Sequence, residues 1–279
     1  MSPLSPPTDA LEQIEITLLL EGVYQHYGHD FRGYAPGTVR RRVLHCLQAE
    51  RLPTVSALQD RVLHDPAAMT RLVAALSIQV TEMFRDPSFY RALREQVLPV
   101  LRTHPFLRVW HAGCSTGEEV YSLAILLEEA GLLSRTRLYA TDVSAPALAV
   151  ARQGIYSAEK LAGYARNYTD AGGARSFSAY FTQGQGHALV SAPLRQNVIW
   201  GQHNLVTDGS FNEFHLILCR NVMIYFARPL QEQVQGLLHA SLVTFGVLGL
   251  GQHETLEFSP HSAHFETLNY REKLYRRIA

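Results

Sequence analysis

The chain has 279 residues, 47% of them hydrophobic and 18% charged, a composition that supports a hydrophobic core and is not typical of a disordered protein. Its 25 basic residues balance 25 acidic ones, so the overall charge does not favour nucleic acid or a membrane surface as the partner. The first residues lack the basic and apolar regions of a signal peptide, and no apolar run is long enough to span a membrane.

The cysteines, Cys46, Cys114 and Cys219, are odd in number and form no CxxC pair. This spacing argues against a disulfide framework or a zinc site, and it predicts a reducing, cytoplasmic location. His261 and His264 could line one helical face, but no cluster of further ligands accompanies them. We therefore expect no metal site.

Residues 1–86 predict a small helical domain. The first stretch opens with a possible aspartate cap and carries apolar residues at helical spacing, and the next places Val39, Val43, Leu44 and Leu47 on one side. No strand-like alternation is present. Further helices are expected over residues 54–66 and 66–80.

After Arg108, short β-rich segments alternate with helical ones, which predicts an α/β fold with a parallel sheet and helices on both of its faces. The continuously apolar character of the β-rich segments suits buried parallel strands. Residues 270–277 alternate instead, which favours an antiparallel edge strand. The β-rich segments are residues 107–112, 137–142, 197–204, 214–221 and 247–253, and the helical ones include 120–131 and 145–154.

A glycine-rich interruption between Gly163 and Asn197 is too long for an ordinary connection, so we interpret it as a small inserted β-subdomain. The predicted organisation is therefore a helical domain at residues 1–86, followed by an α/β domain at residues 87–279. The insertion covers about residues 163–197 of the second domain.

The turn "HAGCSTGEE" follows the first predicted strand, and Gly113 and Gly117 allow close approach of the backbone. Glu118 and Glu119 stand in the first turn of the next helix, where two carboxylates would repel a phosphate. Asp142 ends the second predicted strand, where an acid can accept hydrogen bonds from ribose hydroxyls. A cationic cofactor with a ribose and no phosphate fits this pattern, and S-adenosylmethionine is such a cofactor.

Each of these residues also has a purely structural interpretation. A glutamate at a helix start can simply complement the helix dipole. Asp142 could cap the helix that begins near Ala145, and a glycine turn alone is a weak signal. The three features in order, at βαβ spacing, favour cofactor binding.

Several motifs together resemble the CheR family of chemoreceptor glutamate methyltransferases, over about residues 20 to 278. The resemblance implies an N-terminal all-helical domain and a Rossmann-like S-adenosylmethionine-dependent methyltransferase sheet with an inserted β-subdomain. It also implies methyl transfer to glutamate side chains on cytoplasmic helices of a bacterial chemoreceptor, with S-adenosylhomocysteine as product. The motifs are "TEMFRD", "VWHAGCSTGEEVYSLA", "ATDVS", "ARQGIY", "NL" at 204–205 and "CRNVMIYF", with "RRRVLHCL" and "GLGQHE" fitting more loosely.

By position, the resemblance implies a set of cofactor contacts, in which Arg85 pairs with the carboxylate of the cofactor and Tyr225 lies beside the reactive methyl group. Gln79 stands where the family often has Asn, and Met83 stands where Phe is usual. A core aromatic is the alternative interpretation of Tyr225. The implied cofactor-binding residues are Gln79, Thr81, Arg85, Gly113, Glu118, Asp142, Asn204, Leu205 and Asn221, and the implied catalytic residues are Tyr225 and Arg85.

The chemistry suits this reading, because a glutamate side chain is ionised at neutral pH and acts as its own nucleophile without a general base. Arg40, Arg41 and Arg42 would give the second helix a basic edge for docking on acidic receptor helices, although an ordinary solvated face has the same appearance. Whether the inserted unit holds a receptor tether stays open. The alternative functions are a non-catalytic S-adenosylmethionine-binding sensor or scaffold, and a methyltransferase for RNA or a small molecule.

Overall fold

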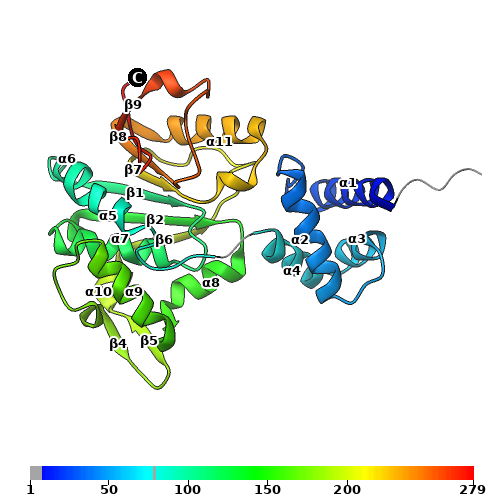
Figure 1. The fold of residues 1–279 in the computed structure, drawn as a ribbon, viewed down its shortest axis with the longest axis horizontal. Helices are drawn as coiled ribbons and strands as arrows, with labels where there is room; N and C mark the ends of the chain where they lie inside the picture. The colour runs from blue at the N-terminus through cyan, green and yellow to red at the C-terminus, as the bar shows by residue number, and fades with distance from the viewer. Residues whose placement is uncertain (1–7, 78–79) are drawn as a thin grey trace, which may run out of the picture. The chain divides into compact units, whose positions relative to one another are not determined.

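The computed structural model describes residues 8–77 and 80–279, which form two compact units (Figure 1). The first unit contains the chain up to Ile78 together with Tyr225–Gln231. The second contains Gln79–Ile224 and Glu232–Ala279.

The first unit is helical, as the sequence predicts. Two helix starts are capped by side chains that accept backbone N–H groups: Thr54 Oγ1 accepts from Ala57 at 3.1 Å, and Asp65 Oδ1 accepts from Ala67 at 2.9 Å. Each helix buries one apolar stripe, which includes Leu19, Val43, Leu58 and Leu72. The helices are α1 (Thr8–Tyr27), α2 (Pro36–Ala49), α3 (Val55–His64) and α4 (Pro66–Leu76).

The segment Tyr225–Gln231 completes the first unit. The carbonyl oxygen of Tyr225 accepts a hydrogen bond from Ala35 N–H at 2.9 Å, and the rings of Tyr34 and Phe226 lie 4.8 Å apart. Leu230 packs on Gly33, where a Cβ atom would come within 3.0 Å of the leucine side chain. These contacts join segments nearly 200 residues apart in sequence.

The second unit is built on a seven-stranded sheet in the order β6-β2-β1-β7-β8-β10-β9. The first five strands in this order are parallel, and β10 is antiparallel to both of its neighbours. The strands are β1 (Leu107–Ala112), β2 (Thr136–Asp142), β6 (Val198–Gln202), β7 (Phe214–Cys219), β8 (Leu242–Leu250), β9 (Phe265–Asn269) and β10 (Leu274–Arg277).

The parallel sheet was predicted, but one expectation about its edge is wrong. Residues 274–277 do form an antiparallel strand, yet β9 covers its outer side, so β9 and not β10 is the edge strand. The β9 segment is short, and it follows a stretch with no regular apolar spacing, so the sequence does not mark it as a strand.

Helices surround this sheet. A long helical segment leads into β1 and comprises α5 (Pro87–Ala92), a π-helical turn (Leu93–Val97) and α6 (Leu98–Leu101). The remaining helices are α7 (Glu118–Glu129), α8 (Ala145–Gln153), α9 (Ala158–Asp170), α10 (Ala192–Gln196) and α11 (Arg228–Ala240), with short 3-10 turns at Leu133–Arg135, Phe177–Tyr180, Met223–Tyr225 and Ser262–His264.

A second, three-stranded antiparallel sheet forms the small β-subdomain, in the order β3-β5-β4. In Figure 1, β4 and β5 lie beside α9 and α10, away from the large sheet. The subdomain also draws on residues before Gly163, because β3 precedes α9 in the chain. The strands are β3 (Ile155–Ser157), β4 (Phe181–Gln183) and β5 (His187–Val190).

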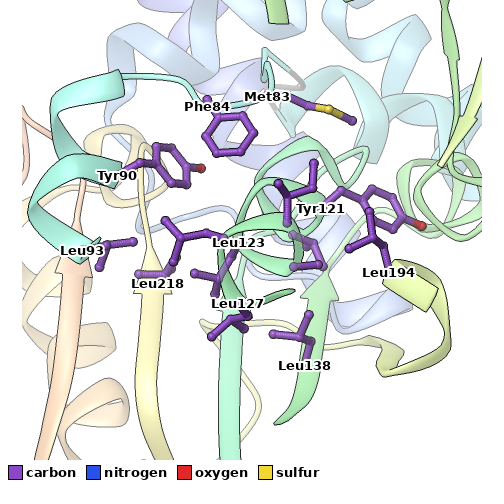
Figure 2. Packing of buried hydrophobic residues seen from close by; sticks show 14 of the residues in the cluster. Met83, Phe84, Tyr90, Leu93, Tyr121, Leu123, Leu127, Leu138, Leu194 and Leu218 are labelled. Carbon is purple, nitrogen blue, oxygen red and sulfur yellow. The ribbon is translucent and has the colours of Figure 1, made fainter. Parts of the chain in front are cut away.

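The main core lies between α7 and the large sheet. Figure 2 shows Leu123 and Leu127 of α7 packed near Leu138 of β2 and Leu218 of β7. Phe84, Tyr90 and Leu93 belong to the same cluster (Figure 2). Because α7 is buried along most of its length, the loop that begins it is held firmly against the sheet.

Candidate functional site

The candidate residues of the second unit gather at the carboxyl ends of its parallel strands. Gly113 and Gly117 lie in the turn between β1 and α7, both at positive φ, +79° and +90°. A Cβ atom on Gly113 would come within 2.5 Å of Val222, and one on Gly117 within 2.9 Å of Ala151. Both glycines are therefore required by the turn and by neighbouring protein atoms. Direct contact of Gly113 with a cofactor stays a prediction.

Asp142 ends β2 beside this turn. Its Oδ2 atom accepts a hydrogen bond from Ser115 N–H at 2.8 Å, and its Oδ1 atom accepts one from Ser144 N–H at 2.9 Å. Burial raises the pKa of Asp142, and the backbone N–H groups offset only part of that rise. Ser144, whose side chain accepts from Ala147 N–H, is the cap of α8. The alternative interpretation of Asp142 as the helix cap is therefore wrong.

The two adjacent glutamates of α7 have different surroundings. Glu118 is 2% exposed, and its carboxylate accepts hydrogen bonds from Thr116 Oγ1 at 2.6 Å and from Tyr164 Oη at 3.5 Å. Burial raises the pKa of Glu118. Burial would also raise the pKa of Glu119, but the hydrogen bond with His111 and the charge of Arg220 outweigh it and lower that pKa. Glu119 thus shares the charge of Arg220 with Asp86, and Glu118 has no ion pair among the described residues. Repulsion of a phosphate by the two glutamates stays a prediction.

Arg220, which sequence reasoning did not single out, joins three segments of the second unit. Its side chain is 1% exposed, and its guanidinium group contacts Asp86 Oδ2 at 2.7 Å and Glu119 Oε2 at 3.0 Å. The guanidinium carbon also lies 3.9 Å from the centre of the Phe89 ring. The signal available in the sequence was that Arg220 and Asp86 both directly adjoin predicted site residues.

The segment that carries Thr81 and Arg85 has an unusual backbone. Phe84 and Asp86 adopt positive φ angles of +54° and +58°, which are uncommon for residues other than glycine. Phe84 N–H donates to Ser122 Oγ at 2.9 Å, and the ring of Phe84 is fully buried.

Met83 is fully buried, so the presence of Met where Phe is usual is a change within the core. Thr81 and Arg85 are half-buried, and Arg85 Nη1 donates to the carbonyl oxygen of Val80 at 3.0 Å. Gln79 lies outside the described residues.

Asn204 and Leu205 follow β6 in a tight turn. Asn204 Oδ1 accepts from Val206 N–H at 3.0 Å, and Asn204 N–H donates to Asp208 Oδ2 at 2.8 Å. Leu205 is buried. This Asx turn fixes where the asparagine backbone lies next to the end of β6.

Asn221 follows β7 with a φ of +60°, and its N–H donates to Glu254 Oε2 at 2.9 Å. Sequence reasoning did not select Glu254, although the motif "GLGQHE" ends on it. Tyr225 is counted with the first unit. Its predicted place beside the cofactor stays a prediction.

The three arginines on α2 are not equivalent. Arg40 forms an ion pair with Glu12 Oε1 at 2.6 Å, Arg41 is exposed, and Arg42 is half-buried. Three consecutive helical positions point in three directions. The three arginines of α2 therefore do not form a continuous basic edge. Of the three, Arg41 has an exposed side chain and no ion pair among the described residues.

The remaining sequence-level candidates have ordinary surroundings. All three cysteines are buried as free thiols. His261 and His264 lie near His239, with ring centres 4.9 to 6.5 Å apart, and no group of three potential ligands within residues 8–77 and 80–279 has the geometry to hold a metal. None of the helices described is long and apolar enough to cross a membrane.

Asp142 and Glu118 thus differ from Glu119 at this end of the sheet. Neither forms an ion pair with a basic side chain in the described part of the chain, whereas Glu119 is paired with Arg220. Burial disfavours the charge on both, as their raised pKa values indicate. A ligand that brings hydroxyl groups and positive charge would stabilise the two carboxylates, so this pair of hydrogen-bond acceptors fits a sulfonium nucleoside.

Two family descriptions match almost the entire chain. "CheR methyltransferase, all-alpha domain" matches residues 14–77, and "CheR methyltransferase, SAM binding domain" matches residues 79–274.

Individual relatives extend this finding. The protein Cher3 of Pseudomonas putida is 49% identical over 264 residues, which cover 95% of this chain and 97% of Cher3. The chemotaxis protein methyltransferase of Listeria monocytogenes is 29% identical and covers 88% of this chain, with 92% of its own length matched. Chemotaxis protein methyltransferase 2 of Pseudomonas aeruginosa is 34% identical and covers 71% of this chain, with 70% of its own length matched.

Proposed function

Because the chain belongs to the CheR methyltransferase family, with S-adenosylmethionine as its cofactor, we propose that it methylates glutamate side chains of a bacterial chemoreceptor or a related signalling protein. The observation that carries the proposal is the pair of carboxylates at the carboxyl edge of the sheet, the half-buried Asp142 and the buried Glu118, neither of which forms an ion pair among the described residues. The names of the relatives from Listeria and Pseudomonas aeruginosa support the chemosensory substrate.

Bound S-adenosylmethionine would supply an electrophilic methyl group on a sulfonium centre. Asp142 would accept hydrogen bonds from the ribose hydroxyls, since each of its oxygens retains acceptor capacity beside the backbone N–H it already holds. Arg85 would pair with the carboxylate of the cofactor, and a guanidinium group suits this role because it offers two parallel donors. Thr81, Asn204, Leu205 and Asn221 would complete the contacts, with Gln79 proposed from the sequence alone.

The acceptor carboxylate would need no base from the enzyme. A glutamate is ionised at neutral pH, so one of its oxygens would attack the methyl carbon that the cofactor supplies, with the thioether product as the leaving group. No proton would move. The enzyme would contribute alignment and exclusion of water, with Tyr225 orienting the acceptor oxygen.

Docking would depend on charge at the surface of the helical unit. Receptor helices that carry methylation sites are acidic, and Arg41 offers an exposed positive charge on α2. Arg40 and Arg42 would contribute less, because the first is already paired with Glu12 and the second is half-buried. The proposed partner is thus the cytoplasmic helical part of a methyl-accepting receptor.

The proposal is tested by incubating the protein with methyl-labelled S-adenosylmethionine and receptor-bearing membranes, followed by mild alkali. A carboxyl methyl ester releases volatile labelled methanol, and N-methyl products do not. We expect volatile label that depends on both protein and receptor. Tight binding of S-adenosylhomocysteine with no transfer to any receptor would instead support the sensor or scaffold function. Label that is stable to alkali would support methylation of RNA or another substrate.

A further inference from the structure

Glu254 lies in the turn after β8. Its side chain is buried, and among the described residues its two carboxylate oxygens accept hydrogen bonds from backbone N–H groups alone. Oε2 accepts from Gly251 at 2.6 Å and from Asn221 at 2.9 Å, and Oε1 accepts from Val222 at 2.9 Å, Met223 at 2.7 Å and Ile224 at 3.3 Å.

Four of these five donors belong to one segment, residues 221–224, which directly follows β7. Asn221 at its start adopts a φ of +60°, a conformation that a non-glycine residue keeps only where its surroundings hold it. The consecutive N–H groups of this segment converge on one anion, in the same way as backbone nests bind anions. A carboxylate from a distant part of the chain therefore determines the shape of this segment.

The space around the carboxylate is filled. A Cβ atom on Gly251 would come within 2.8 Å of Glu254 Oε2, 2.8 Å of Asn221 N and 2.9 Å of Asn221 Nδ2. Glycine is thus the only residue type that fits at position 251 without displacing the carboxylate or Asn221. The absence of a side chain at Gly251 lets the Glu254 carboxylate and Asn221 lie close together.

We infer that Glu254 is a positioning residue for the methyl transfer, because it sets the backbone that presents Asn221 to the cofactor. The inference rests on the proposed function, in which Asn221 contacts S-adenosylmethionine. Glu254 itself is enclosed by protein N–H groups, so its role is to act through Asn221 and not to touch the substrate. The segment also leads directly into Tyr225, so its shape bears on the proposed catalytic residue through chain connectivity.

The test is a double-mutant cycle on the affinity for S-adenosylhomocysteine, measured by calorimetry with the full chain. Glu254→Gln keeps the shape but replaces one acceptor oxygen by a donor, so either the pair Gly251 and Asn221 or the run 222–224 loses its acceptor, and both outcomes disturb the segment that carries Asn221. We expect roughly tenfold weaker binding, comparable with the loss in Asn221→Ala. If Glu254 acts through Asn221, Glu254→Gln adds little further loss in the Asn221→Ala background.

Glu129→Gln is the matched control. The side chain of Glu129 in the second unit is only 7% exposed, and it accepts hydrogen bonds from Tyr168, Tyr180 and Arg94, away from Asn221. This variant should lose stability without changing the dissociation constant of the folded protein. The inference is overturned if folded Glu254→Gln binds with wild-type affinity, or if the two losses multiply fully in the double mutant.

A second variant covers the case in which Glu254→Gln does not fold. Gly251→Ala retains the carboxylate but pushes it away from Asn221, and we expect weaker S-adenosylhomocysteine binding in the same cycle. Wild-type affinity in Gly251→Ala would count against the inference. Because the readout is cofactor affinity, it is independent of the methyl acceptor: a wild type that methylates no receptor glutamate would defeat the proposed function and leave the cycle interpretable.

Discussion

The guanidinium group of Arg220 and the carboxylate of Asp86 form a 2.7 Å ion pair across 134 residues of sequence. Arg220 contacts Glu119 on its other side, so a single buried cation holds the segment before α5 and the start of α7. The candidate cofactor residues Arg85, Glu118 and Asn221 each directly adjoin one of these three charged residues in the chain. The network therefore aligns three parts of the site at once.

Replacing Arg220 by Leu should lower the free energy of unfolding by about 3–5 kcal/mol, because it leaves two carboxylates without their cation in a buried place. Urea unfolding measures this loss. Arg276→Leu is the control, since Arg276 pairs with Glu266 at the surface and its loss should cost less than about 1 kcal/mol. Equal effects of the two substitutions would show that the buried network adds no special stability.

Replacing Asp142 by Ala should weaken the binding of S-adenosylhomocysteine by roughly 10- to 100-fold, because hydrogen bonds to a charged group contribute about 1.5–3 kcal/mol. Calorimetry measures the affinity. Asp65→Ala is the matched control, because Asp65 also accepts a backbone N–H but caps α4 in the helical unit. Unchanged affinity in Asp142→Ala would remove the ribose assignment.

Replacing Tyr225 by Phe should slow methyl transfer while leaving the affinity for S-adenosylhomocysteine within about twofold of wild type, since the ring is retained and only one hydroxyl group is lost. Single-turnover labelling at saturating cofactor gives the transfer rate, and calorimetry gives the affinity. A wild-type transfer rate in this variant would show that the hydroxyl group does not orient the acceptor.

As the pH is lowered, cofactor binding should begin to weaken at a higher pH than the usual pKa of an aspartate would predict. The pKa of Asp142 in the free protein is raised by burial, so its carboxylate gains a proton at a higher pH than in the unfolded chain. Affinity should be constant near pH 7 and fall as the pH decreases toward that raised pKa. The measurement is the dissociation constant of S-adenosylhomocysteine as a function of pH.

Asp142→Asn provides the comparison for the pH series. Its affinity is lower throughout, and the part of the acid decline that comes from Asp142 should be absent. The pKa of Glu118 is also raised, so a residual decline is expected in Asp142→Asn and should disappear when Glu118→Gln is added. Parallel pH profiles for wild type and Asp142→Asn would contradict the assignment.

The parallel strands and the glycine turn could be predicted because they depend on local patterns. Runs such as residues 107–112 and 214–219 are buried in the sheet at every position but the second, and Gly113 and Gly117 stand where the backbone requires positive φ. The α-helical character of the first unit follows in the same way from the spacing of its apolar residues.

The interactions that shape the site could not be predicted in this way. Arg220 is 101 residues from Glu119, and Glu254 is 33 residues from Asn221, so no local spacing pairs them. Their importance comes from burial, which makes an unpaired charge costly, and burial is known only once the chain is folded. The edge strand β9 was missed because its short segment has little apolar alternation to mark it.

The segment Tyr225–Gln231 has a practical consequence for dissecting the protein. The helical unit is completed by residues that come after β7, so an excised fragment ending at residue 77 would lack Phe226 and Leu230 and would expose the surfaces of Tyr34 and Gly33 that they cover. A fragment that begins after residue 78 would retain the same seven residues without their packing partners. Segments of the two units alternate along the sequence, so no single truncation yields either unit intact.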